Sequence, residues 1–252
     1  NVWCAAGKGT FGTEELIKRV STSSLDKVVT HRKLILPQLG AVGVSASAVQ
    51  KATGFRVSFG PVQARDIPAY VAAGYKKTPE MALIKFPMKD RIILTPMEIN
   101  PAMKKFPWFA GAVLLIFGLQ PEGILFKQAF LGSLPFLLLG LLSVFAGAFL
   151  TPALLPFVPF RSFAIKGWIM GMLAMFAALP LLGLAVQGNT LLFAAAWLFF
   201  PAMTSYLALQ FTGSTTFTGM SGVRKELKIG IPLYIGAASL SAILLIVFKL
   251  RE

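Results

Sequence analysis

In the first 105 residues of the chain, short hydrophobic stretches alternate with polar ones. After residue 105 the hydrophobic residues form long continuous stretches. Beyond Lys105, runs of 16, 33, 57 and 20 residues carry no charged side chain. A membrane-spanning helix needs about 20 mostly apolar residues. The runs therefore predict five spans, near 106–119, 130–150, 164–186, 190–211 and 229–248. The first run is short, and a buried or re-entrant helix is the alternative there.

The first part of the chain shows the alternating pattern of an α/β domain. Helices are expected over 14–20, 45–52 and 65–73, with Thr13 as the N-cap of the first. Glycines end the other two. Short apolar runs predict strands at 34–36, 56–59 and 91–94.

Strands that alternate with helices pair in parallel, and such sheets bind ligands at the carboxyl ends of their strands. We therefore expect a Rossmann-like α/β domain over 1–103 and an all-α transmembrane domain over 104–252. Because the strands are few, and because the chain begins with Asn1, we expect this domain to lack its N-terminal strands.

Composition and charge fit this division. Hydrophobic residues make up 56%, charged residues 13%, and the mean hydropathy is +0.72, which excludes a disordered chain and disfavours an ordinary soluble protein. Lys and Arg near the span ends predict a cytoplasmic N-terminal domain and an external C-terminus. Spans two to five hold no acidic residue, which argues against a proton-coupled pump.

Few side chains are available for metal chemistry or nucleophilic catalysis. The single cysteine, Cys4, and the single histidine, His31, exclude an internal disulfide, a multi-cysteine zinc site and a histidine cluster. Cys4 has two interpretations: a buried inert thiol, or a thiolate whose pKa Lys8 lowers. The segment 7–12 spells G-x-G-x-x-G, a weak dinucleotide motif here because only six residues precede it.

Residues 1–13 read Asn-Val-Trp-Cys-Ala-Ala-Gly-Lys-Gly-Thr-Phe-Gly-Thr. On this segment the chain resembles the mercury-methylating membrane corrinoid proteins, the HgcA family. The resemblance continues through 36–44, 54–57, 60–68 and 76–81 and into the five predicted spans. The first part also resembles the corrinoid-binding domain of the large subunit of the corrinoid iron–sulfur protein. That relative has neither the five spans nor a cysteine at the position of Cys4.

The family resemblance implies a methyltransferase that passes a methyl group from a corrinoid to Hg(II), forming methylmercury. The corrinoid, of the cobalamin type, would be bound base-off, with the Cys4 thiolate as the lower axial ligand of cobalt. A stretch before Asn1 would be absent. The residues expected to contact the corrinoid are Asn1, Val2, Trp3, Cys4, Ala5, Ala6, Gly7, Lys8, Gly9, Thr10, Gly12, Gln38, Leu39, Gly40, Gly43, Val44, Gly60, Pro61 and Ala64.

The resemblance also implies partners and a location. The partners are a ferredoxin-like protein with two [4Fe-4S] clusters, which would donate electrons and mercury-binding thiols, and a methyltetrahydrofolate-dependent methyltransferase as the methyl source. The location is the cytoplasmic membrane of a prokaryote, with the lipid bilayer as a partner and no nucleic acid. Two alternatives stay open: a corrinoid methyl carrier with another acceptor, and a membrane anchor or transport protein with a non-catalytic α/β domain.

Overall fold

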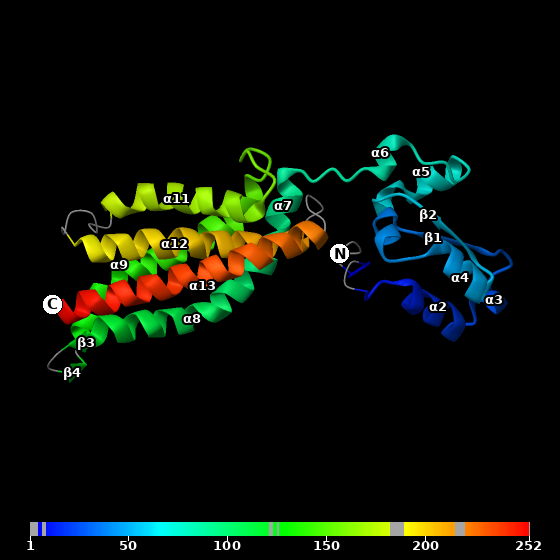
Figure 1. Cartoon of the computed structure of the whole chain (residues 1–252). Coiled ribbons are helices and arrows are strands. Elements are labelled where there is room, and N and C mark those ends of the chain that lie inside the picture. The colour runs from blue at the N-terminus through cyan, green and yellow to red at the C-terminus, as the bar shows by residue number, and fades with distance from the viewer. Residues whose placement is uncertain are drawn as a thin grey trace. The chain divides into compact units, whose positions relative to one another are not determined.

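The computed structural model shown in Figure 1 describes residues 5–6, 9–120, 123–124, 126–181, 189–214 and 220–251. The chain divides into two compact units, Asn1–Phe86 and Pro87–Glu252. Most of the described residues are helical. The first unit contains a small parallel sheet of two strands, and the second contains four long apolar helices among the described residues.

The first unit is built around the parallel pair β1 (Lys33–Leu36) and β2 (Arg56–Phe59), in which Lys33 lies opposite Arg56 and Leu36 opposite Phe59. The connection between the strands contains the 3-10 helix η1 (Gln38–Val42) and the helix α4 (Ala46–Thr53). The other elements are α2 (Thr13–Thr22), α3 (Leu25–Val28), η2 (Ala64–Asp66), α5 (Ile67–Ala72) and α6 (Pro79–Ala82). Both strands and the crossover helix contribute to one core, made of Leu36, Val44, Val49 and Val57.

Local sequence signals explain the boundaries of α4. The Ser45 hydroxyl accepts a hydrogen bond from the Ala48 amide at 3.4 Å, so Ser45 is the N-cap. Gly54 ends the helix with a φ of 74°, a left-handed conformation that glycine adopts without strain. The predicted helix over 45–52 is therefore confirmed, with the terminators expected for it.

Two sequence predictions in this part are wrong. Thr13 is the first residue of α2 and does not cap it; the N-cap position is Gly12, and the Thr13 side chain bonds to a different segment. Residues 91–94, expected as a strand, belong to the helix α7 (Met88–Leu94). A short apolar run fits a buried helix as well as a strand, and here Arg91 and Thr95, one helical turn apart, are both buried.

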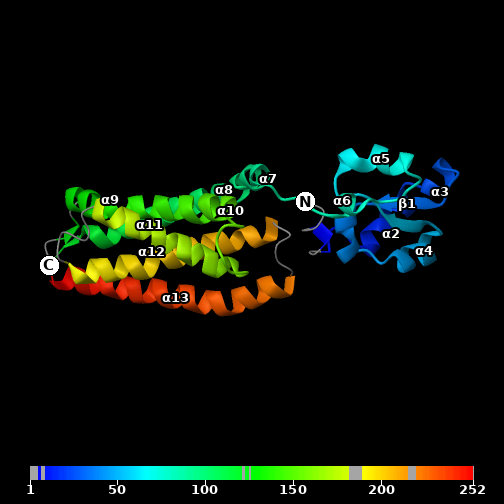
Figure 2. The same ribbon diagram turned by 90° about the horizontal axis from the view of Figure 1, so that it is seen from above.

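The second unit is helical. Its long elements are α8 (Pro96–Gly118), α9 (Phe126–Phe145), α11 (Phe163–Leu181), α12 (Thr190–Gln210) and α13 (Met220–Arg251). Short elements join or extend them: β3 (Leu119–Gln120), β4 (Gly123–Ile124), the π-helix η3 (Ala146–Leu150), α10 (Thr151–Ala153) and η4 (Phe211–Ser214). In Figures 1 and 2 the long helices run roughly along one common direction.

Four segments among the described residues are long and apolar enough to cross a membrane: Ala129–Ala153, Phe163–Pro180, Thr190–Gln210 and Ser221–Arg251. The chain is accordingly a multi-pass membrane protein. The first predicted span, 106–119, lies in the second half of α8 except for Leu119, which begins β3, and it is not one of the four. Its 14 residues extend about 21 Å as a helix, less than the ~30 Å of a bilayer core. The remainder of the predicted 164–186 span beyond 181 lies outside the described residues.

The helical path after α9 continues through η3 and α10 to Ala153. Trp197 packs against the core of the bundle, and its indole nitrogen is buried with no hydrogen-bond partner among the described residues. Trp108 is 82% exposed.

Helix α12 is the centre of this unit, since it packs against α9, η3, α11 and α13. Glycines on its neighbours permit the close approach. A Cβ on Gly171 of α11 would lie 2.8 Å from the Pro201 Cα, and one on Gly147 of η3 would lie 2.7 Å from the Thr204 carbonyl oxygen. A Cβ on Gly167 would collide with Ala208. Gly167 and Gly171 thus form a small-xxx-small contact surface of the kind that membrane helices use.

We expect Gly171→Ala to destabilise the bundle by about 1–3 kcal/mol, because the added methyl group meets backbone atoms that cannot move away independently. Thermal unfolding in detergent, followed by circular dichroism, measures the effect. Gly236→Ala in α13 is the control, since a Cβ there meets nothing within 4 Å. Equal stability of the two variants would contradict this account of the packing.

Candidate functional site

The predicted corrinoid site lies in the first unit, and the structure describes part of it. Asn1, Val2, Trp3, Cys4, Gly7 and Lys8 lie outside the described residues. The proposed role of Cys4 therefore stays a prediction. Ala5, Ala6 and the segment from Gly9 onward are described, as are both strand-end loops.

The described N-terminal residues form a tight turn held by main-chain hydrogen bonds. The Ala5 carbonyl accepts from the Phe11 amide at 3.1 Å and from the Thr10 hydroxyl at 3.1 Å. The Gly9 amide donates to the Ala6 carbonyl at 3.2 Å. Gly9 has a φ of 80°, so the turn depends on a residue that tolerates the left-handed region. These bonds fix the backbone on the C-terminal side of Cys4.

This turn is attached to the loop that follows β1. The Thr13 amide donates to the Gly43 carbonyl at 3.1 Å, and the Thr13 hydroxyl accepts from the Ser45 amide at 2.9 Å. Thr13, misassigned as a helix cap, is thus the residue that links two segments 30 positions apart. The sequence indicated that the Thr13 hydroxyl would accept a hydrogen bond, but the partner that it accepts from is decided by tertiary structure.

Glycines allow the two segments to touch. A Cβ on Gly43 would lie 2.8 Å from the carbonyl oxygens of Ala6 and Phe11, and one on Gly40 would lie 2.7 Å from the Phe11 ring. A Cβ on Gly12 would lie 3.2 Å from the Gly9 carbonyl oxygen. The structure thus gives Gly12, Gly40 and Gly43 a packing role, whereas a Cβ on Gly9 would meet nothing within 4 Å. Contact of these residues with a corrin stays a prediction.

The second strand-end loop begins beside the first. The Gly60 amide donates to the Leu36 carbonyl at 2.8 Å, which joins the carboxyl ends of β2 and β1. A Cβ on Gly60 would lie 2.7 Å from the Ile35 side chain. Gly60 and Pro61 are buried, and Ala64 is exposed at the start of η2. The structure therefore brings together three groups of predicted site residues: 5–6 with 9–12, 38–44 and 60–64.

Polar partners of this region include one that the sequence did not indicate. Lys77, just before α6, donates to the Gln38 side-chain oxygen. Leu39 is half-buried and Val44 is buried in the core beside it. Sequence reasoning missed Lys77 because no local pattern connects it to a residue 39 positions earlier.

Glu15, Arg19 and His31 of the first unit lie outside these three segments. Arg19 donates to Glu15 at 2.7 Å on α2, and this guanidinium lowers the pKa of the Glu15 carboxyl. His31 is exposed, and its Nδ1 accepts from the Lys33 amide at 3.4 Å. No group of three or more His, Cys, Asp or Glu residues that could hold a metal ion occurs in the described part of the chain.

Comparison with known proteins gives no relative: no family model, no curated protein and no solved structure matches the chain. A functional proposal therefore depends on the sequence motif and on the arrangement of the three segments.

Gly43→Ala should loosen the N-terminal turn, because a methyl group at Gly43 meets two carbonyl oxygens of that turn. Hydrogen exchange of the full chain, read by mass spectrometry, is expected to show faster exchange at the Thr13 and Ser45 amides. Overpacking of this kind costs about 1–3 kcal/mol, which is a rise in opening of about fivefold to 150-fold. Ala41→Ser is the control, since Ala41 is exposed on the same loop. Unchanged protection of these amides in Gly43→Ala would contradict the packing role of Gly43.

Proposed function

We propose that this chain is a membrane-bound, corrinoid-dependent methyltransferase that converts Hg(II) to methylmercury. The observation that carries the proposal is the attachment of the segment after Cys4 to the loop after β1. Ligands of parallel α/β sheets bind at the carboxyl ends of the strands. A side chain just before Ala5 would therefore lie at the edge where a cofactor binds. The motif of residues 1–13 is the second support.

The described residues at this edge fit a corrin. Gly9 has open space beside its Cα, and Ala41, Val42 and Ala64 are exposed, with Val42 66% exposed. Backbone and small apolar side chains of this kind let a large flat ring approach closely. No carboxylate of the strand-end loops stands at this surface, since 38–44 and 60–64 contain no acidic residue.

A bound corrinoid would supply the cobalt-carried methyl group, and the chain would supply the axial ligand and its position. The Cys4 thiolate would bind cobalt and raise its electron density, the effect that an axial thiolate has in haem proteins. That favours transfer to an electrophile such as Hg(II). The hydrogen bonds of Ala5, Ala6 and Thr13 would hold the ligand in place, and Gln38, Leu39, Gly40, Gly60 and Pro61 would shape the floor beneath the ring.

The second unit would anchor this reaction at the cytoplasmic membrane. We include α8 as a fifth crossing, because Val113 and Phe117 of α8 lie in the core of the bundle. Lys104 and Lys105 are exposed near its beginning and can extend toward the lipid headgroups. With five crossings the first unit is cytoplasmic and the C-terminus external, as the distribution of Lys and Arg predicts.

The proposal requires two partners. Hg(II) prefers thiolates, and Cys4 is the only cysteine in the sequence. The mercury-delivering thiols would therefore come from a ferredoxin-like protein with two [4Fe-4S] clusters, which would also reduce the cobalt. A methyltetrahydrofolate-dependent methyltransferase would supply the methyl group.

Cys4→Ala tests the role of the cysteine. We expect it to abolish Hg(II) methylation by the anaerobically purified full-length protein with the ferredoxin partner, and to change the visible spectrum of the corrinoid. Cys4→His should retain a ligated cobalt spectrum and lower the methylation rate, because imidazole donates less electron density than a thiolate.

Thr53→Ser serves as a control, since Thr53 ends α4, away from the three segments. An unchanged spectrum and unchanged methylation in Cys4→Ala would overturn the thiolate mechanism. Corrinoid binding without mercury methylation would favour a methyl carrier with another acceptor. No corrinoid binding at all would favour a membrane anchor or transport protein.

A further inference from the structure

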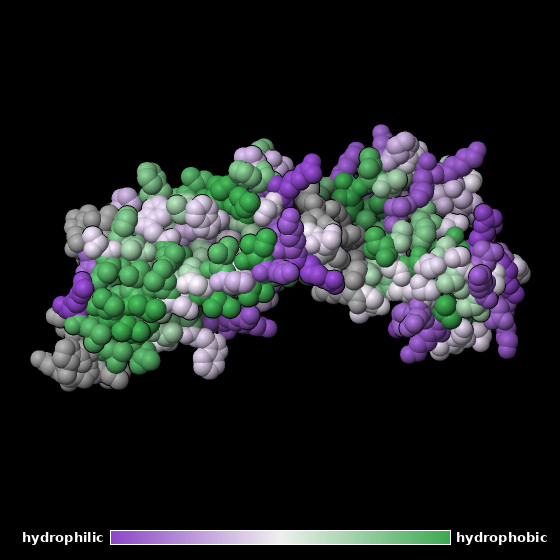
Figure 3. All heavy atoms as spheres, in the orientation of Figure 1, coloured by the Kyte–Doolittle hydropathy of each residue, from purple (hydrophilic) through white to green (hydrophobic). Residues whose placement is uncertain are grey.

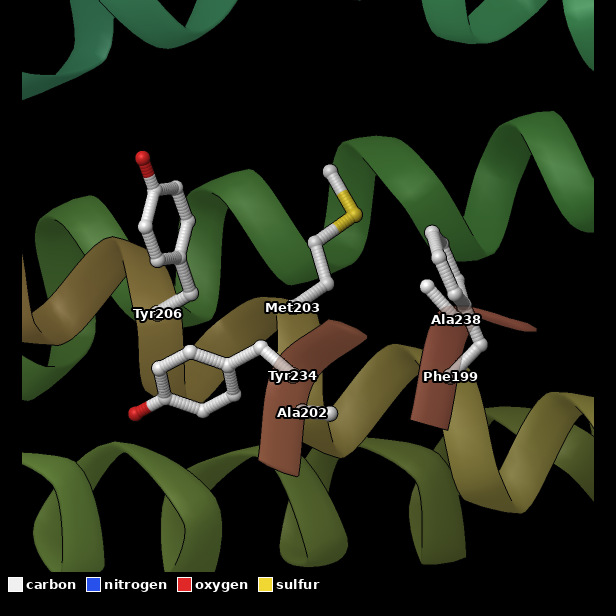
Figure 4. Close-up of a pocket in the computed structure, with 6 residues that line it drawn as sticks. All are labelled: Phe199, Ala202, Met203, Tyr206, Tyr234 and Ala238. Atoms are coloured by element: carbon white, nitrogen blue, oxygen red, sulfur yellow. The ribbon is translucent and has the colours of Figure 1, made fainter. Parts of the chain in front are cut away.

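A small groove lies between α12 and α13 in the membrane-spanning bundle. Figure 4 shows its lining: Phe199, Ala202, Met203 and Tyr206 from α12, and Tyr234 and Ala238 from α13. Its volume is about 180 Å³. A cavity of about 150 Å³ holds one benzene-sized group, and cofactor sites usually exceed ~300 Å³. The groove therefore accommodates a segment of a hydrocarbon chain and excludes a large ring system.

The groove is apolar at one end and carries hydroxyl groups at the other. Phe199 and Ala238 form the apolar end, and Tyr206 and Tyr234, whose ring centres are 5.7 Å apart, form the other end. The tyrosine end faces the beginning of α13, since Tyr234 precedes Ala238 along that helix. Tyr206 is 37% exposed, so this end opens to the surface of the bundle.

Hydrogen bonds hold the tyrosine end in place. The Ser205 hydroxyl donates to the Ala164 carbonyl at 2.7 Å and lies 2.8 Å from the Tyr234 hydroxyl. Because Ser205 has one proton, Tyr234 must be the donor to Ser205. The Tyr234 ring also lies against Gly230, where a Cβ would approach it to 2.9 Å. The wall of the groove is thus fixed by three helices.

Exposed basic side chains lie on α13 between its beginning and the tyrosine end of the groove. Arg224, Lys225 and Lys228 are exposed in the first turns of α13, and Lys228 lies about 9 Å along the helix from Tyr234. The acidic residue among them, Glu226, accepts hydrogen bonds at 2.9 Å from the Ser162 hydroxyl and the Ala164 amide, at the beginning of α11. Figure 3 shows hydrophilic residues gathered at the end of the bundle where α13 begins.

Lys105 on α8 lies at about the same depth in the bundle as Tyr234 on α13. The Lys249 ammonium of α13 lies 6.0 Å from the centre of the Phe117 ring on α8, and both helices begin at the same end of the bundle (Figure 1). Counted back from this contact, Lys105 lies about 18 Å along α8 and Tyr234 about 22 Å along α13. Cations from two helices therefore flank one apolar groove.

We propose that this groove binds one anionic phospholipid of the phosphatidylglycerol type. Its phosphate would lie near Arg224 and Lys228, and part of one acyl chain would occupy the space between Met203 and Ala238. The charge of the mouth selects an anionic headgroup, because each Lys or Arg near an anionic lipid contributes about fivefold in affinity. The apolar lining of the groove binds the acyl chain of the lipid. The acyl chain would also cover exposed side chains of α13.

The test is lipid retention by the full-length protein in detergent, read by native mass spectrometry. The probes are dioleoyl-phosphatidylglycerol and dioleoyl-phosphatidylcholine, added in equal amounts. We expect one phosphatidylglycerol molecule to be retained in preference to phosphatidylcholine. Arg224→Gln with Lys228→Gln should lower that preference by about tenfold or more, whereas Lys249→Gln with Arg251→Gln, at the other end of α13, should leave it unchanged.

Substitutions that fill the groove test the binding of the acyl chain independently of the binding of the charged headgroup. Ala238→Leu places a larger side chain in the groove and should reduce retention of both lipids, while Gly236→Leu, on the open side of the same helix, should not. Equal retention of the two lipids, or equal effects of the Ala238 and Gly236 variants, would overturn the proposal. If Ala238→Leu fails to fold, the paired Arg224 and Lys228 variants still decide, because both side chains are exposed.

Discussion

The helical unit depends on the close approach of two chain segments, η3 and α11, to one stretch of α12. Gly147, Gly167 and Gly171 leave room for the backbone of α12 between Pro201 and Ala208. Hydroxyl groups then bond across the helices: Ser143 to the Phe200 carbonyl, Ser205 to the Ala164 carbonyl and Ser241 to the Ala195 carbonyl. Lipid is as apolar as a leucine side chain, so contact area and hydrogen bonds of this kind supply the association that water would otherwise drive.

The same physical device organises the first unit on a smaller scale. Gly40 and Gly43 let the N-terminal turn reach the loop after β1, and Thr13 joins the two through its main chain and its hydroxyl. Both parts of the proposed enzyme are therefore positioned by backbone contact at glycine. The site that results is made of main-chain atoms and small side chains, which suits a large cofactor that brings its own metal.

Local signals allowed much of this to be predicted. Charge-free runs located the four membrane-crossing helices, and Ser45 and Gly54 fixed the ends of α4. Three features were out of reach because distant residues decide them. The run 91–94 became helical because one face of it is buried, Thr13 found a partner 30 positions away, and Lys77 found one 39 positions away. The chemical role of Cys4 rests on a motif whose first four residues lie outside the described part of the chain.

The contact of Glu226 with the first turn of α11 has a consequence for how the bundle assembles. A helix begins with amides that have no partner within the helix, and here a carboxylate from α13 accepts from one of them, the Ala164 amide. Glu226 follows Ala164 by 62 positions in the chain, so the start of α11 obtains this partner only when α13 packs against it. The carboxylate then lies at the positive end of α11 and joins the last helix of the chain to a helix that is not its neighbour in sequence.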